Sequence, residues 1–109
     1  MLVSIGIGAN GGTGCACLHF GTPTTHSPMG RRLAASIMRS LVDGLGMKDL
    51  GVHARSVAIL RETRMPAVLV ELPGDADPST HEGTFTWAVA DAIARGIEAL
   101  ARPVPQSAD

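Results

Sequence analysis

Glu71 is the residue whose type and position most directly suggest chemistry. It stands near the end of the apolar run Ala67–Leu72 (AVLVEL), whose composition is typical of a strand covered on both faces. A carboxylate at the end of a buried strand costs free energy unless a ligand or a reaction uses it. Because ligands of open α/β sheets bind beyond the carboxyl ends of the strands, Glu71 is the first candidate for proton transfer.

A second group of candidates lies on one predicted strand near the N-terminus. Cys15, Cys17 and His19 alternate along it and therefore share one face. They could offer metal ligands, although alternate positions of a single strand seldom surround a tetrahedral ion. We favour a half-buried edge strand over a metal site.

The glycines at positions 6, 8 and 11 match the G-x-G-x-x-G spacing of dinucleotide-binding loops. That fingerprint requires a helix immediately afterwards and an acidic residue about 20 positions on. The segment GGTGCACLHFGTP is a poor helix former, and no acidic residue precedes Asp43. We therefore interpret this stretch as a Gly-rich loop between two strands rather than as a nucleotide site.

Apolar periodicity predicts the elements that position these residues. The predicted strands are residues 2–7, 16–20, 57–60 and 67–72; the predicted helices are residues 29–45 and a last helix that begins at Thr84. Ser27 and Pro28 give the first helix its start signal, and Gly44 and Gly46 its stop. We expect Lys48–Arg55 to be a polar connection. The last helix should pack through Trp87, Ala90, Ile93, Ile97 and Leu100.

Length and composition limit the possible architectures and partners. The 109 residues allow one domain, which we place at residues 1–101, followed by a disordered tail at 102–109. The formal net charge of -1 gives no electrostatic footprint for nucleic acid or an anionic membrane. The sequence contains neither a recognisable signal peptide nor an apolar run long enough to span a membrane. Cys15 and Cys17 are too close together to form a good disulfide with each other.

Three segments resemble the catalytic domain of zinc-dependent N-acetylmuramoyl-L-alanine amidases. The most specific is residues 57–72, in which ILRETRMPAVLVEL is similar to the family pattern V-L-R-x-x-x-M-P-A-V-L-V-E-x-G-F. VSIGIGANGG near the N-terminus resembles V-S-I-H-A-N-G-G, and AVADAIARGIEAL resembles the closing helix. The resemblance extends from about Leu2 to Leu100. It implies the C-terminal part of an amidase domain: an α/β fold with a mixed sheet of about four strands and two packing helices, an incomplete version of a three-layer domain.

The resemblance also implies an activity and roles for individual residues. The family hydrolyses the amide between N-acetylmuramic acid and the L-alanine of the peptidoglycan stem peptide, in the cell envelope or outside the cell. By motif position Glu71 is the general base, and Asn10 and Arg61 are candidates for substrate contacts. For Arg61, a solvated turn is the alternative interpretation. Peptidoglycan or a muramyl peptide is the implied partner, and a homo-oligomer is possible.

Zinc is the cofactor that the family implies, but its ligand set is incomplete here. The family ligands are His, Glu and His, of which two belong to an N-terminal half with no counterpart in this sequence. The third should stand in S-I-H-A-N, where residues 4–10 read SIGIGAN and contain no imidazole. We expect the remaining histidines, His19, His26, His53 and His81, to lie on the surface or in loops. The alternative hypothesis is therefore a truncated, non-catalytic remnant that acts as a binding or regulatory module.

Overall fold

The structure is a computed structural model, in which residues 1–8, 14–22, 25–57, 60, 65–73 and 83–101 are described. The predicted sites at Asn10 and Arg61, the histidine at position 81 and the tail at 102–109 lie outside these residues. Within them, no helix is long and apolar enough to cross a membrane.

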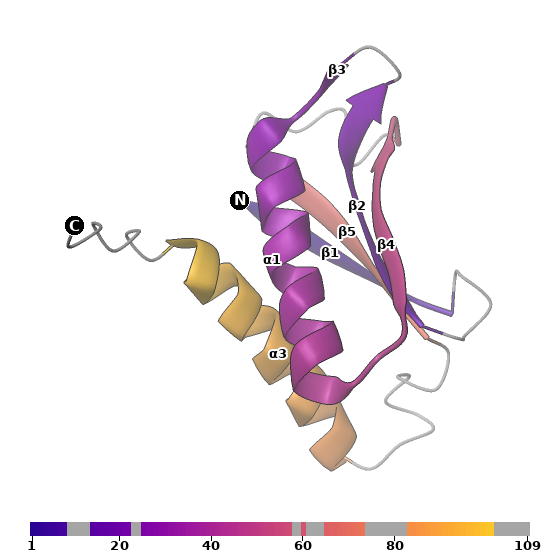
Figure 1. Ribbon diagram of the computed structural model, residues 1–109, viewed down its shortest axis with the longest axis vertical. Helices are drawn as coiled ribbons and strands as arrows, with labels where there is room; N and C mark the ends of the chain where they lie inside the picture. The colour runs from indigo at the N-terminus through magenta and orange to yellow at the C-terminus, as the bar shows by residue number, and fades with distance from the viewer. Residues whose placement is uncertain (9–13, 23–24, 58–59, 61–64, 74–82, 102–109) are drawn as a thin grey trace, which may run out of the picture.

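A mixed β-sheet forms one layer of the molecule and two helices form the other (Figure 1). In chain order the elements are β1 (Leu2–Ile7), β2 (Cys15–Thr22), β3 (Thr25–His26), α1 (Pro28–Leu45), β4 (Asp49–Arg55), β5 (Ala67–Leu72) and α3 (Gly83–Ala101). Across the sheet the order is β1-β5-β2-β4, and the two-residue β3 pairs with the end of β2. Strand β5 runs parallel to β1 and antiparallel to β2, while β2 and β4 are parallel. This arrangement confirms the predicted α/β fold with a mixed sheet.

The main core lies between the helices and one face of the sheet. Val68, Val70 and Leu72 of β5 point into it, and they alternate with Leu69 and Glu71 on the opposite face. Strand β2 contributes Cys15 and Cys17, which are buried free thiols. From the helices the core receives the buried residues Leu33, Ala34, Ile37, Met38, Leu41, Val89, Ala92 and Ile93.

Helix α1 begins and ends at the predicted signals. The Ser27 side chain accepts a hydrogen bond from the Gly30 amide at 3.1 Å, and Pro28 occupies the first turn. At the other end Gly46 adopts a left-handed φ of 69°, and its amide donates to the Val42 carbonyl. The buried stripe of the helix includes Leu33, Ile37 and Leu41, spaced four residues apart as expected.

Helices α1 and α3 approach closely because small residues line their contact. A Cβ added at Gly96 would lie 2.7 Å from the Ile37 Cα. The Ser36 hydroxyl donates to the Gly96 carbonyl at 2.6 Å, and the Ser40 hydroxyl donates to the Ala92 carbonyl. The helix pair is therefore held by backbone proximity and by two side-chain hydrogen bonds as well as by apolar packing.

Two predicted elements differ from the structure. The segment Lys48–Arg55, expected to be a connection, forms strand β4, which pairs in parallel with β2. Tertiary pairing overrides its polar composition, because an edge strand tolerates charged residues. Conversely, Val57 is not in a strand, and the Leu60 amide donates to the Val57 carbonyl as in a helical turn. The prediction of a strand at 57–60 was wrong at the residues the structure describes.

Two predicted environments were also wrong. Strand β2 is an interior strand between β5 and β4, so Cys15, Cys17 and His19 are buried rather than half-buried at an edge. In α3 the predicted packing was confirmed for Ile93, Ile97 and Leu100, which lie in or against the core, but it was wrong for Trp87, which is 76% exposed, and for Ala90. The buried arc runs instead through Val89, Ala92, Ile93 and Gly96. Contact with α1 on one side of α3 rotates the packed face away from Trp87.

Candidate functional site

Glu71 lies near the carboxyl end of β5, on the sheet face opposite the helices. Its chain neighbours Val70 and Leu72 point into the helix-side core, so alternation places the Glu71 side chain on the other face. There it is half-buried. Since β5 is an interior strand, the carboxylate stands between two neighbouring strands.

The residues in register with Glu71 on both sides are small. Gly6 of β1 is its partner in the parallel pair, and Ala16 of β2 is its partner in the antiparallel pair. Among the described residues, a Cβ added at Gly6 would meet only a Leu69 side-chain atom, at 3.9 Å. One step back along the strands, Leu69 is flanked by Ser4 and Leu18. The carboxylate therefore projects above an almost apolar floor, and its neighbours in register among the described residues leave the position beside it unfilled.

The described histidines do not join Glu71. His19 is buried on the helix face, in register with Val68, and its Nδ1 lies 3.2 Å from the Phe20 carbonyl oxygen. The expectation of a surface or loop position was wrong for His19. His53 lies in β4, in register with Leu18, and its Nε2 is 2.6 Å from the Leu50 carbonyl oxygen. It is two strands away from β5, about 10 Å across the sheet.

Cys15 and Cys17, the buried thiols on either side of Ala16 in β2, both have raised pKa values. Burial, followed by the nearby Cys15 thiol and the Glu71 carboxylate, raises the pKa of Cys17 from its ordinary value of 9.0 to about 12. Burial and the Asp49 carboxylate also raise the pKa of Cys15. Both thiols are thus held in the neutral form, which is a poor metal ligand and a poor nucleophile.

The described residues do not fit a zinc ion. Among them no three His, Cys, Asp or Glu side chains come close enough together to hold a metal. Beside Glu71, Gly6 and Ala16 have no donor atom in their side chains. A structural or catalytic zinc site needs at least three protein ligands, so the part of the chain that the structure describes does not supply one.

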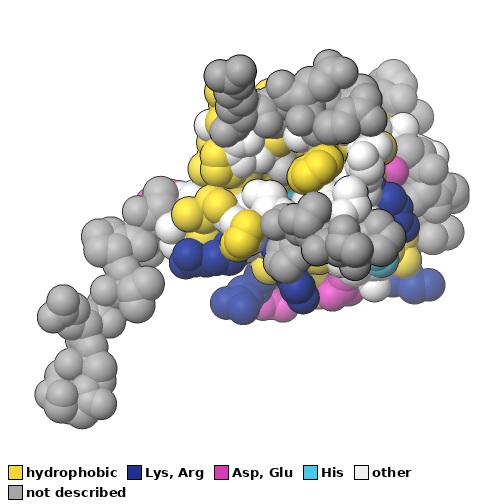
Figure 2. Space-filling model, turned by 90° about the horizontal axis from the view of Figure 1, so that it is seen from above, with side chains coloured by type: hydrophobic (Ala, Val, Ile, Leu, Met, Phe, Trp, Pro, Cys, Tyr) yellow, Lys and Arg dark blue, Asp and Glu magenta, His cyan; other side chains and the backbone are white. Residues whose placement is uncertain are grey.

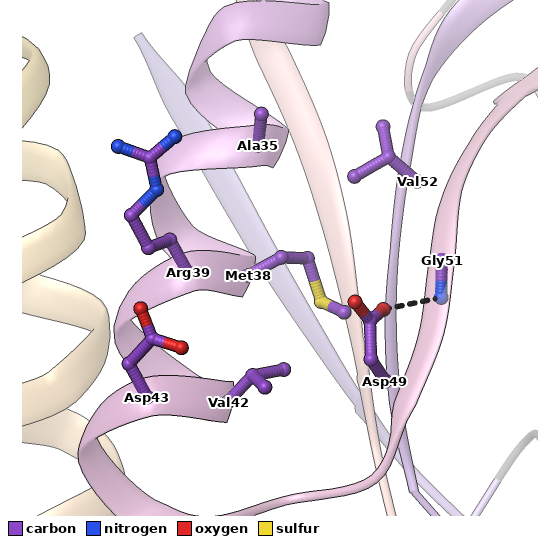
Figure 3. A pocket seen from close by; sticks show the side chains of 8 residues that line it. All are labelled: Ala35, Met38, Arg39, Val42, Asp43, Asp49, Gly51 and Val52. Atoms are coloured by element: carbon purple, nitrogen blue, oxygen red, sulfur yellow. Dashed lines mark hydrogen bonds between the residues drawn. The ribbon is translucent and has the colours of Figure 1, made fainter.

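A pocket of about 340 Å³ lies elsewhere, between α1 and β4 (Figure 3). Met38 and Val42 of α1 point toward β4, where the Asp49 carboxylate accepts a hydrogen bond from the Gly51 amide at 2.8 Å. Arg39 and Asp43 are exposed at its rim. The pocket is on the helix side of the sheet, so it is separate from the Glu71 face and has no buried polar group of its own.

The fold and the position of Glu71 define an α/β domain with a carboxylate at the carboxyl end of an interior strand, an arrangement that suits a hydrolase. The chain belongs to the N-acetylmuramoyl-L-alanine amidase family, whose match covers residues 1–99. This match confirms the family that the three sequence segments suggested.

Individual relatives agree with the family assignment. The chain is 38% identical over 90 residues to the N-acetylmuramoyl-L-alanine amidase CwlM of Mycobacterium tuberculosis, a match covering 82% of this chain and 22% of CwlM. Among solved structures, the amidase Ami1 of Mycobacterium smegmatis is 27% identical with a TM-score of 0.69, covering 90% of this chain and 52% of Ami1. The catalytic domain of CwlV from Paenibacillus polymyxa has the same fold, with a TM-score of 0.65 at 23% identity, and the match covers 89% of this chain and 56% of that domain. The chain thus spans about half the length of these two solved structures and 22% of CwlM.

Proposed function

We propose that the chain is part of a peptidoglycan amidase domain that hydrolyses the amide between N-acetylmuramic acid and the L-alanine of the stem peptide. The observation that supports this most is the place of Glu71. It is a half-buried carboxylate at the carboxyl end of an interior strand, and in the part of the chain that the structure describes no side chain fills the position over Gly6 beside it. The work of such an enzyme would be done in the cell envelope or outside the cell.

In this proposal Glu71 is the general base. Its carboxylate accepts a proton from the water that attacks the amide carbonyl, and then donates that proton to the leaving nitrogen of L-alanine. The C–N bond breaks, and the products are the lactyl carboxylic acid of the sugar and a free amine. The apolar floor formed by Leu69 and Leu18 limits the water around the carboxylate and strengthens its interactions with the substrate.

The substrate contacts proposed for Asn10 and Arg61 rest on the family resemblance. Asn10 follows the strand β1 that carries Gly6, and Arg61 precedes the strand β5 that carries Glu71. An asparagine amide and a guanidinium offer hydrogen-bond donors to the carbonyl and carboxylate groups of a muramyl peptide. Zinc, which the family implies, has no ligand set among the described residues, so no residue of this chain is assigned to it.

A non-catalytic role is the second candidate function. The observation that favours it is the lack of donor side chains at Gly6 and Ala16, directly beside Glu71. A chain with the amidase sheet but without a metal centre would bind muramyl peptide, or regulate another protein, without cleaving the amide.

Cleavage of purified peptidoglycan in a zinc-containing buffer distinguishes the two functions. New L-alanine amino groups are measured for the wild-type chain, for Glu71→Gln, and for Asp43→Asn, an exposed change on the helix side of the sheet. The amidase proposal expects release that Glu71→Gln lowers by about 100-fold or more and that Asp43→Asn leaves intact. Saturable binding of peptidoglycan without release would instead support the binding module.

A further inference from the structure

The outer face of the helix layer carries charges of both signs around one groove. The groove consists of two adjoining hollows of about 240 and 410 Å³ between the helices. Four charged side chains line it and are exposed, namely Arg39 and Asp43 of α1 and Asp91 and Arg95 of α3. Figure 3 shows the Arg39 side chain turned away from β4, toward α3. We call these four residues, with the small residues Ser36, Ser40 and Gly44 between them, the α1–α3 face.

Two hydrogen bonds between the helices fix the levels of these charges. The Ser36 hydroxyl donates to the Gly96 carbonyl, and the Ser40 hydroxyl, one turn further along α1, donates to the Ala92 carbonyl. Since the numbers rise along α1 while they fall along α3, the two helices are antiparallel. A residue of α1 between positions 36 and 40 therefore has its neighbours on α3 between positions 92 and 96.

The charges form one positive and one negative band across the helix pair. Arg39 and Arg95 lie between the two hydrogen-bonded contacts, whereas Asp43 and Asp91 lie past the Ser40 contact, nearer the end of α1. The two bands are about one helical turn apart. Within α3 the Asp91 carboxylate and the Arg95 guanidinium form an ion pair at 2.7 Å, yet both side chains are more than half exposed. All four charges can therefore reach a molecule that covers the groove.

This pattern is complementary to itself when a second copy is turned end to end. A two-fold axis that crosses both helices at the level of Ser40 places each positive band opposite the negative band of the other copy. Arg39 then faces Asp43 of the second copy, and Arg95 faces Asp91 of the second copy. Symmetry repeats both pairs. If the two copies were aligned in the same direction, like charges would face one another and repel.

We propose that the α1–α3 face is a dimer interface, through which two copies of the chain pack their helix layers together end to end. The ion pairs between opposite bands fix the alignment of the two copies. Between the charges the side chains are small or absent, at Ser36, Ser40 and Gly44, so the helix backbones of the two copies can approach closely.

A second copy matches this face better than a partner that carries charge of one sign. A nucleic acid or an acidic peptide would be attracted to the arginine band and repelled by the aspartate band about one turn away. A basic segment would meet the reverse. Figure 2 shows side chains of both signs, dark blue and magenta, gathered along its lower edge, which is the side of the helix layer in Figure 1. A surface with the same two bands in reversed order satisfies all four charges, and a second copy provides it.

The size of the face indicates a weak, reversible dimer. With 18 residues in α1 and 19 in α3, each helix is about 27 to 29 Å long, and two helices side by side are about 20 Å wide. Each copy then contributes roughly 500 Å², and the total of about 1,000 Å² is at the lower end for specific interfaces. We therefore expect a dissociation constant on the order of 100 μM at low salt.

The dimer leaves the candidate site uncovered, because Glu71 lies on the opposite face of the sheet. Substitutions on the α1–α3 face therefore test assembly separately from amide hydrolysis. A chain that hydrolyses the amide as a monomer would contradict this inference alone. A dimer without hydrolysis would contradict the proposed function alone.

Sedimentation equilibrium of the full 109-residue chain, at about 20 mM and about 500 mM NaCl, measures the dissociation constant. Arg39→Glu sets a carboxylate against Asp43 of the other copy, and Asp43→Arg sets a guanidinium against Arg39 of the other copy, twice each by symmetry. We expect each variant to weaken self-association by about tenfold or more, and high salt to weaken the wild-type dimer by about threefold or more. Arg31→Glu makes the same change of charge at an exposed position outside the groove, so it should change the constant by less than about twofold.

Mixing the two interface variants tests the alignment itself. Arg39→Glu makes both charges of its α1 negative and Asp43→Arg makes both positive, so the mixed dimer regains opposite charges at every pair. We expect the mixture to associate about tenfold more tightly than either variant alone, and the double variant Arg39→Glu/Asp43→Arg to dimerise like the wild type. Circular dichroism checks that each variant is folded. A wild-type chain that is monomeric at about 1 mM in low salt, a dimer insensitive to Arg39→Glu, or a mixture no tighter than its components would each overturn the proposal.

Discussion

Gly6 and Glu71 lie directly opposite each other in the parallel pair β1–β5, on the sheet face that α1 and α3 do not cover. Partners in register share a face, and neighbouring strands are about 5 Å apart, so any side chain at position 6 would stand beside the carboxylate. Gly8, by contrast, follows the end of β1 and has a left-handed φ of 82°. Of the two glycines in the segment that resembles S-I-H-A-N, Gly6 is the one positioned to meet Glu71.

Gly6→His should create a metal-binding pair with Glu71. No described atom lies closer than 3.9 Å to a Cβ built at position 6, and Gly6 has no left-handed φ that would strain an L-residue. An imidazole and a carboxylate side by side supply two ligands, and we expect a gain of about tenfold or more in Co²⁺ affinity, measured from the visible absorption of the bound ion. Ser4→His is the matched control, because Ser4 shares the face but is in register with Leu69. An equal gain in both variants would contradict this geometry.

Gly96→Val should destabilise the fold by separating the two helices. A Cβ at Gly96 would meet the backbone of Ile37 at 2.7 Å and the Ser36 carbonyl oxygen at 3.0 Å, and neither can move as a flexible side chain would. We expect a loss of about 2 kcal/mol or more in the free energy of unfolding, measured by urea denaturation. Gly44→Ala is the control within a helix. A Cβ at Gly44 meets no described atom within 4 Å, so this change should raise the free energy of unfolding by about 0.5 to 1 kcal/mol. Similar stability of both variants would show that the helices do not touch at Gly96.

Ser27→Ala should remove the cap of α1. The Ser27 hydroxyl oxygen accepts a hydrogen bond from the Gly30 amide. This amide lies in the first turn and has no carbonyl partner within the helix. The expected cost is about 1 kcal/mol in the same urea experiment. Ser27→Asp keeps an acceptor and places a negative charge at the helix N-terminus, so it should stay within a few tenths of a kcal/mol of the wild type. A loss in Ser27→Asp as large as in Ser27→Ala would argue against capping.

The Cys17 thiol should make stability fall in alkaline solution. Its pKa is raised to about 12 in the folded chain, whereas an unfolded thiol titrates near 9.0. Above pH 9 the unfolded chain releases this proton while the folded chain keeps it. The stabilising contribution of Cys17 to the free energy of unfolding is thus fully present below pH 9. It is lost as the pH rises toward 12, at up to about 1.4 kcal/mol per pH unit.

Cys17→Ala isolates this effect from the titration of other groups. Between pH 8 and pH 10.5 the unfolding free energy of the wild type should fall more steeply than that of Cys17→Ala, as measured by urea denaturation at both pH values. The same burial predicts that iodoacetamide labels Cys17 only after unfolding. Parallel pH profiles for the two chains would show that Cys17 ionises freely in the folded state.

Local sequence signals determined the parts of this protein whose physics is local. The sequence of α1 contains an N-cap serine, an apolar stripe and a C-terminal glycine that adopts a left-handed φ. The run AVLVEL is apolar enough to be predicted as the interior strand β5. The family and the candidate base Glu71 followed from motif residues around that strand.

Only the tertiary structure decided what depends on pairing and on packing direction. Strand β4 exists because Asp49–Arg55 pairs with β2, although its residues alone suggest a connection. Trp87 is exposed because the contact of α3 with α1 fixes which face of α3 is buried. The apolar periodicity of a helix does not by itself indicate which element will cover its apolar face. The meeting of Gly6 with Glu71 joins residues 65 positions apart, and strand register over such a distance is set by the whole sheet rather than by either segment.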